Sequence, residues 1–125
     1  QDEVNHAKTS FEIASILLGE TVEPSMLPPS NHTFGPNLTE LAVTTAREGC
    51  IDETLSALAA GLEVEYEIDQ NRRIDDQTNR LLKRKIRAIA IEETQHSVLA
   101  WRTVQWACGD DSVICSNILR NEVFV

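Results

Sequence analysis

Residues 86–108 form the stretch that most constrains the fold, because they follow the pattern of one long helix. The residues of one helix face follow one another at steps of three and four: Ile86, Ile89, Glu93, His96, Ala100 and Thr103. A carboxylate and an imidazole therefore interrupt an apolar face that should point inward. Because a buried charged group without compensation is costly, Glu93 and His96 each need an opposite charge, a hydrogen bond or a metal ion.

The same spacing occurs a second time, at the start of the chain, as Glu3-Val-Asn-His6. A single Glu-x-x-His pattern is most often a histidine that is hydrogen-bonded to its own helix. Here, however, two of the three histidines have a glutamate one turn upstream. The repetition favours a metal site, and we predict Glu3, His6, Glu93 and His96 as ligands.

Length and composition indicate one helical domain. A chain of 125 residues is long enough to bury a single core, and 42% hydrophobic residues with few aromatics and glycines suit an all-α protein better than a sheet. The net charge of −9 reads as a solvated acidic surface. Basic and aromatic residues do not cluster as nucleic-acid binding requires, and no apolar run approaches the ~20 residues of a membrane span. We therefore expect neither nucleic acid nor a membrane as partner.

Breaker residues divide the chain into four helices. All four prolines lie in residues 19–37, an extended connection long enough to let the next helix run parallel to the first. A tight turn is expected near residues 70–76. The predicted helices cover about 1–18, 38–70, 77–108 and 111–122. Their predicted N-caps are Asn37 and Asp75 or Asp76, and their predicted stops are Gly19 and Gly109.

The second helix should supply a third carboxylate. In an antiparallel hairpin of helices 38–70 and 77–108, facing residues have a nearly constant sum of residue numbers, which places Glu53 opposite Glu93 and His96. Small residues flank Glu53 and leave room for ions: Ala46, Gly49, Ala57 and Ala60. Glu48 stays the alternative, because it lies in heptad phase with Leu41, Leu55 and Leu62. These three, with Ile51 and Leu58, are the apolar residues expected on the core side of this helix.

The three cysteines bear on the compartment. Cys50, Cys108 and Cys115 are an odd number without a C-x-x-C pair, so we expect buried thiols of a reduced compartment, the cytoplasm being favoured. The spacing of seven residues between Cys108 and Cys115 leaves a disulfide open.

A Glu-x-x-His on each of two helices, with a further glutamate from another, is the donor set that holds two iron or manganese ions in a helical bundle. At this point the chain resembles the ferritin-like superfamily of di-iron carboxylate proteins. The segments that carry the resemblance are Asp2-Glu3-Val-Asn-His6-Ala7, Arg47-Glu-Gly-Cys-Ile-Asp-Glu53-Thr54 and Glu93-Thr-Gln-His96-Ser-Val-Leu-Ala-Trp101-Arg102.

The resemblance implies an antiparallel four-helix bundle with a long crossover and two iron ions, with manganese as the alternative. In that family a further glutamate comes from a helix that would precede Gln1, so we expect this sequence to be a fragment. Its site would be incomplete or completed by a helix of another subunit in a homo-oligomer.

The function implied is an oxidoreductase in which two ferrous ions activate dioxygen, which then oxidises an unidentified small-molecule substrate or the metal itself. Glu3, Glu53 and Glu93 would supply charge, and His6 and His96 would be neutral nitrogen ligands. Two alternatives stay open. One is a non-catalytic metal carrier or store, and the other is a metal-free helical interaction scaffold whose Glu and His side chains pair with each other.

Overall fold

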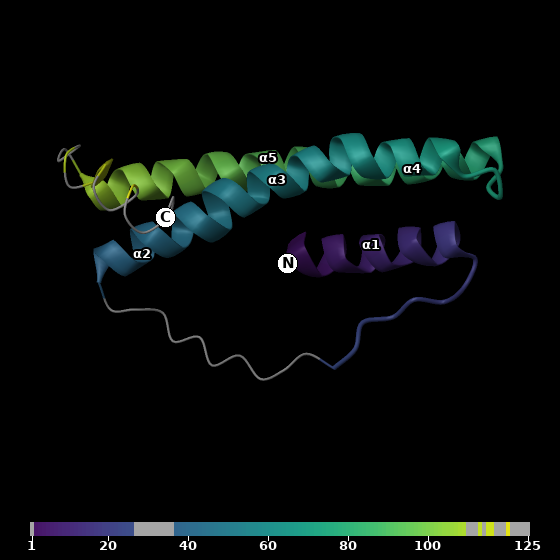
Figure 1. Cartoon of the computed structure of the whole chain (residues 1–125), viewed down its shortest axis with the longest axis horizontal. Helices are drawn as coiled ribbons and strands as arrows, with labels where there is room; N and C mark the ends of the chain where they lie inside the picture. Colours follow the sequence, from purple (N-terminus) through teal and green to yellow (C-terminus); the bar gives the residue numbers. More distant parts are fainter. Residues whose placement is uncertain (1, 27–36, 110–112, 114, 117–119, 121–125) are drawn as a thin grey trace. The chain divides into compact units, whose positions relative to one another are not determined.

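The computed structural model describes residues 2–26, 37–109, 113, 115, 116 and 120. Within these residues the regular elements are all helical (Figure 1): α1 (Asp2–Leu18), α2 (Leu38–Thr44), η1 (Thr45–Asp52), α3 (Glu53–Leu58), η2 (Ala59–Val64), α4 (Glu65–Gln70) and α5 (Asp76–Cys108). The elements from α2 to α4 follow one another without a break, so the described residues form three long helices. The all-α prediction is confirmed, and the predicted helix 111–122 falls largely outside the described residues.

Short polar motifs and glycines fix the helix ends. Asn37 caps α2, its side-chain oxygen accepting the backbone N–H three residues on at 2.8 Å. The Asp75 carboxylate accepts the N–H groups two and three residues on, at 2.8 and 2.9 Å, and so caps α5. Gly19 and Gly109 follow the last residues of α1 and α5 with φ of 75° and 61°, which only glycine adopts at little cost.

Two π-helical segments, η1 and η2, interrupt the second long helix on either side of α3. A π-helix is wider than an α-helix, with hydrogen bonds from i to i+5, so an apolar pattern read with 3.6 residues per turn loses its phase there. The predicted core positions Leu55, Leu58 and Leu62 are accordingly 58%, 53% and 68% exposed. Their assignment to the core is wrong, and the change of helical period is the physical reason.

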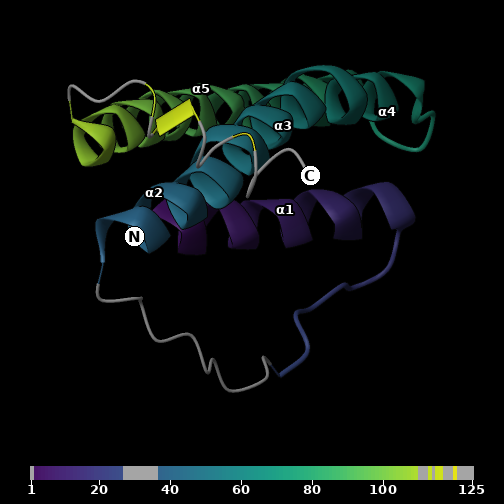
Figure 2. The ribbon, with the colours of Figure 1, turned by 60° about the vertical axis from the view of Figure 1, so that its left-hand side comes forward.

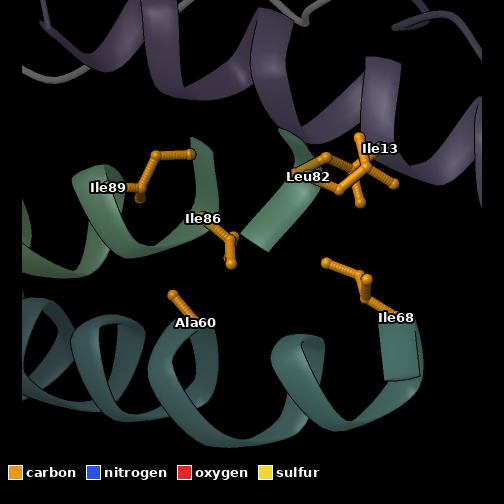
Figure 3. Packing of buried hydrophobic residues seen from close by; sticks show 6 residues of the cluster. All are labelled: Ile13, Ala60, Ile68, Leu82, Ile86 and Ile89. Atoms are coloured by element: carbon orange, nitrogen blue, oxygen red, sulfur yellow. The ribbon is translucent and has the colours of Figure 1, made fainter. Parts of the chain in front are cut away.

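The chain divides into two compact units. The first comprises residues 1–30 and 57–91, and the second comprises residues 31–56 and 92–125. The core of the first unit is a cluster of side chains that point toward one another from α1, the η2–α4 segment and α5 (Figure 3): Ile13, Ala60, Ile68, Leu82, Ile86 and Ile89. Burying one such aliphatic side chain contributes about 1.5–3 kcal/mol.

Polar contacts also join the helices of the first unit, in which α1 lies along α4 and the start of α5 in both views (Figures 1 and 2). Lys83 Nζ lies 2.6 Å from Asp69 Oδ2 and 3.7 Å from Glu65 Oε1. Arg87 Nε donates to Glu65 Oε2 at 3.0 Å, and this hydrogen bond holds the pKa of the Glu65 carboxyl below its ordinary value. The Asn71 amide donates to the carbonyl of Leu17 at 3.0 Å, which ties the α4–α5 turn to α1.

The second unit has a core of small side chains: Ala46, Cys50, Ala100 and Val104, with Cys108 and Cys115 packed against them. Gly49 lies where η1 and α5 approach closely, because a Cβ at this position would be 2.5 Å from the Ala100 Cβ. A side chain cannot be added here without moving one of the two helices.

Cys108 and Cys115 form a disulfide, with 5.2 Å between their Cα atoms. The prediction of three buried thiols is therefore wrong for this pair, whose spacing left a disulfide open. It holds for Cys50, which is free and buried, and whose burial raises the pKa of its thiol. Since structural disulfides belong mainly to oxidising compartments, the cysteines no longer favour the cytoplasm.

Over the described ranges, none of the helices combines the length and apolar character that crossing a bilayer would need.

Candidate metal centre

Glu53, Glu93 and His96 come together in the second unit, from two different helices. Glu53 begins α3, and Glu93 and His96 lie one turn apart on α5. The imidazole Nδ1 of His96 is 3.7 Å from Glu93 Oε2 and 3.8 Å from Glu53 Oε2. One ligand atom from each of the three residues lies within 4.8 Å of those of the other two. An imidazole is thus flanked by carboxylates from both helices.

The close contact between Gly49 and Ala100 explains why these side chains meet. Glu53 lies four residues after Gly49, and His96 lies four residues before Ala100, so each is about one turn away from the contact, in matching directions along the two antiparallel helices. Since a glycine and an alanine let the two backbones approach, the next turns on each helix face each other at short range. Small residues here create the space that the longer Glu and His side chains fill.

The cluster is half-buried and rich in negative charge. Glu93 is only 6% exposed, while the side chains of Glu53 and His96 are 27% and 29% exposed. Two carboxylates held this close repel each other, and their removal from water raises the cost of that repulsion. A cation among them, such as a metal ion, offsets the repulsion.

Of the two carboxylates left open by the sequence, the structure puts Glu53 beside Glu93 and His96. Glu48 lies in η1 with an exposed side chain, and it is outside the group of described residues whose ligand atoms gather here. The heptad phase that favoured Glu48 was read through the π-helical segment η1, where that period does not apply.

Glu3 and His6 form the second Glu–His pair, on α1 in the first unit. His6 is buried, at 7% exposed, and its Nδ1 lies 3.9 Å from Glu3 Oε1, whose side chain is 66% exposed. The glutamate and the imidazole thus lie on one helix face, as the i, i+3 spacing predicts. That Glu3 and His6 bind the same metal centre as Glu53, Glu93 and His96 stays a prediction from the repeated motif.

The donor set of the cluster fits iron or manganese. Carboxylate oxygens suit hard cations such as Mn²⁺, and imidazole nitrogen suits iron among the first-row metals, so a mixed set of two carboxylates and one imidazole fits both. Three protein donors do not fill an octahedral shell, which leaves positions for further ligands.

The sequence reasoning missed a pair of hydroxyl groups beside this cluster. Thr54 follows Glu53, and Ser97 follows His96, and their side-chain oxygens are 2.7 Å apart. A signal was present, because Ser97 lies four residues after Glu93 and is therefore a polar side chain on the same buried face.

Comparison with protein-family models, with curated proteins and with solved structures gives no match, so the resemblance to the ferritin-like superfamily stands on the sequence motifs alone.

Proposed function

We propose that this protein is a non-haem metal-binding protein that holds iron or manganese through Glu53, Glu93 and His96. One observation supports the proposal above all: ligand atoms of two carboxylates and one imidazole lie within 4.8 Å of one another. Their chemistry fits these metals, and the burial of Glu93 gives part of the site the low-dielectric surroundings in which a divalent cation binds carboxylates strongly.

The repeated motif extends the proposal to two metal ions. Glu3 and His6 are the same residue types at the same spacing as Glu93 and His96, and we propose them as ligands of a second ion. A ferritin-like four-helix bundle with a further carboxylate from its first helix belongs to this proposal.

The reaction proposed for such a pair is oxidation by dioxygen: two bound ferrous ions would supply two of the four electrons that reduce dioxygen to water, the substrate would supply the other two, and an external reductant would return the ferric ions to the ferrous state. The chain's own residues would then have three tasks. Glu53 and Glu93 balance the charge of the cations, His96 adds a neutral nitrogen donor, and the apolar neighbours of Glu93 on α5 limit the access of water. The oxidised substrate is a small molecule of unidentified class.

Metal content tests the proposal directly. The purified protein, the Glu53→Gln variant and the Glu48→Gln control are loaded with Fe²⁺ without oxygen, desalted and assayed by elemental analysis. We expect the parent and Glu48→Gln to retain iron and Glu53→Gln to lose it, because the two glutamates lie on one helix and only Glu53 faces the imidazole. Equal iron in the parent and Glu53→Gln would contradict the assignment of Glu53.

A metal-free scaffold is the second candidate, and the same distances favour it. At 3.7 and 3.8 Å from the two carboxylates, a protonated His96 would form ion pairs without any metal. In that case the parent retains no iron, and replacing Glu93 and His96 together by Leu leaves stability unchanged or raises it. If the parent retains iron but consumes no oxygen, the protein is a metal carrier or store.

A further inference from the structure

A hydrogen bond between two hydroxyl groups links α3 to α5 inside the second unit. The Thr54 Oγ1 and Ser97 Oγ atoms are 2.7 Å apart, and Thr54 Oγ1 also donates to the carbonyl of Cys50 at 2.7 Å. Since a hydroxyl has a single hydrogen, Thr54 uses its own for Cys50 and accepts the hydrogen of Ser97. The direction of the interhelical bond is therefore set: Ser97 donates and Thr54 accepts.

This hydroxyl pair lies next in the chain to two residues of the metal cluster in the second unit and one helical turn from the third. Thr54 directly follows Glu53, and Ser97 directly follows His96 and lies one turn beyond Glu93. Ser97 is 7% exposed, whereas Thr54 is exposed, so the hydrogen bond between them is half-buried and is shielded from water on the Ser97 side. While both side chains keep their rotamers, a shift of the backbone that carries Glu53 relative to the backbone that carries His96 changes the Thr54–Ser97 distance and weakens this hydrogen bond.

The hydroxyl pair is also the second of two fixed contacts between the same helices. The first is the approach of Gly49 to Ala100, one turn away from Glu53 and His96. An apolar contact sets a minimum separation but tolerates sliding, whereas an O–H···O hydrogen bond holds its two oxygens within a few tenths of an ångström and restricts the angle. The glycine contact thus sets how closely the helices can approach, and the hydroxyl bond restrains how they are rotated and shifted relative to each other.

We infer that Thr54 and Ser97 are positioning residues that set the geometry at which Glu53 faces Glu93 and His96, and through it the coordination of the bound metal. The inference rests on the proposed metal-binding function. Neither hydroxyl is assigned a contact with the metal; both act through the glutamates and the histidine.

Binding of Co²⁺ tests the inference, because the visible absorption of this ion reports both affinity and coordination geometry. We would titrate the parent, Ser97→Ala and Thr54→Val. Ser97→Ala leaves the Thr54 hydroxyl bonded to Cys50, and Thr54→Val keeps the shape of the side chain, so both variants are expected to fold. Each should bind Co²⁺ about 10–100-fold more weakly, the usual effect of removing a residue that orients metal ligands, and with an altered spectrum.

Two further variants separate positioning from general stability. Thr103→Val removes a hydroxyl from the same helix α5, but that hydroxyl only bonds its own helix, at the carbonyl of Leu99, and the variant should keep the parental affinity and spectrum. Thr54→Ser retains a hydroxyl at the interhelical contact, and this variant should therefore bind Co²⁺ with the affinity and the spectrum of the parent. The double variant with Ser97→Ala and Thr54→Val should bind Co²⁺ no more weakly than the weaker-binding of the two single variants. Both substitutions break the same Thr54–Ser97 hydrogen bond, so their effects on affinity should not add.

The outcomes distinguish this inference from the function on which it rests. If the parent binds Co²⁺ and Ser97→Ala and Thr54→Val bind it with the parental affinity and spectrum, the metal site stands and the positioning role is wrong. That holds equally when these variants melt at lower temperature, since their effect would then be on stability alone. If the parent binds no Co²⁺, the proposed function fails and the inference with it.

Discussion

Glu93 is the residue at which packing and chemistry conflict most directly. Along its face of α5, Ile86 and Ile89 on one side and Ala100 on the other are apolar and buried, and Glu93 itself is 6% exposed. A leucine in this position would satisfy the core, and it would remove one of the two carboxylates that repel each other beside His96. A glutamate that lowers the stability of the metal-free protein is expected at a position where a bound cation offsets the unfavourable burial of its charge.

We therefore predict opposite effects of Glu93→Leu with and without metal. In the presence of a chelator the variant should be at least as stable as the parent, since the change removes the repulsion between the Glu53 and Glu93 carboxylates and puts an apolar side chain at a buried position. With added Mn²⁺ the parent should gain stability with rising metal concentration, and the variant should gain none. Thermal melts with chelator and with Mn²⁺ measure both effects.

The control for this experiment is Glu92→Gln, which changes an exposed glutamate next to Glu93 on the same helix. It should keep the parental response to Mn²⁺. A Glu93→Leu variant that Mn²⁺ stabilises as much as the parent would show that this carboxylate is not a ligand.

At the scale of the helices, periodicity predicted α1 and α5 well and the interior of the second long helix poorly. The breakers and caps gave helices at about 1–18, 38–70 and 77–108, where the structure has Asp2–Leu18, the run from Leu38 to Gln70, and Asp76–Cys108. Inside that run, η1 and η2 change the number of residues per turn, which no apolar pattern announced. The leucine face was misplaced for this reason, whereas Glu53 was located by its distance from the turn, which does not depend on helical phase.

Gly49 and Gly61 provide a matched test of the packing of these π-helical segments. Gly49 lies in η1, where a Cβ would be 2.5 Å from the Ala100 Cβ, and Gly61 lies in η2, where a Cβ would be 4.0 Å from the Ala90 Cβ. We predict that Gly49→Ala lowers the free energy of unfolding by about 1–3 kcal/mol through overpacking. Gly61→Ala should be neutral or stabilising by up to about 1 kcal/mol, because alanine loses less backbone entropy on folding and finds space.

Chemical denaturation followed by circular dichroism measures both glycine variants. Because the contact of Gly49 with Ala100 brings Glu53 and His96 together, Gly49→Ala should also weaken metal binding, and Gly61→Ala should not. Equal unfolding free energies for the two variants would mean that the second unit tolerates a wider separation of η1 and α5 than the structure has.

At the scale of the whole chain, composition predicted the helical class, and the cysteine count misled. The low content of glycine and aromatic residues correctly indicated helices, because each residue has its own helix propensity and these propensities add up along the chain. A cysteine count carries no such information, because pairing depends on whether the Cα atoms of two cysteines come within bonding range in the folded chain. Cys108, at the end of α5, and Cys115, seven residues later, meet this condition, and Cys50 in η1 stays a buried thiol.

Counting thiols tests this arrangement on the intact protein. After denaturation without reductant, and with free thiols protected from oxidation, a thiol-specific dye should detect one cysteine per chain, Cys50, and after reduction it should detect all three. In the native state Cys50 should react slowly, because it is buried and its raised pKa leaves little thiolate at neutral pH. Cys50→Ser should abolish the signal without reductant, while Cys108→Ser should raise it to two by freeing Cys115. Three reactive thiols in the unreduced, denatured parent would show that Cys108 and Cys115 are not bonded to each other. The expectation of three thiols in a reducing compartment would then be supported again.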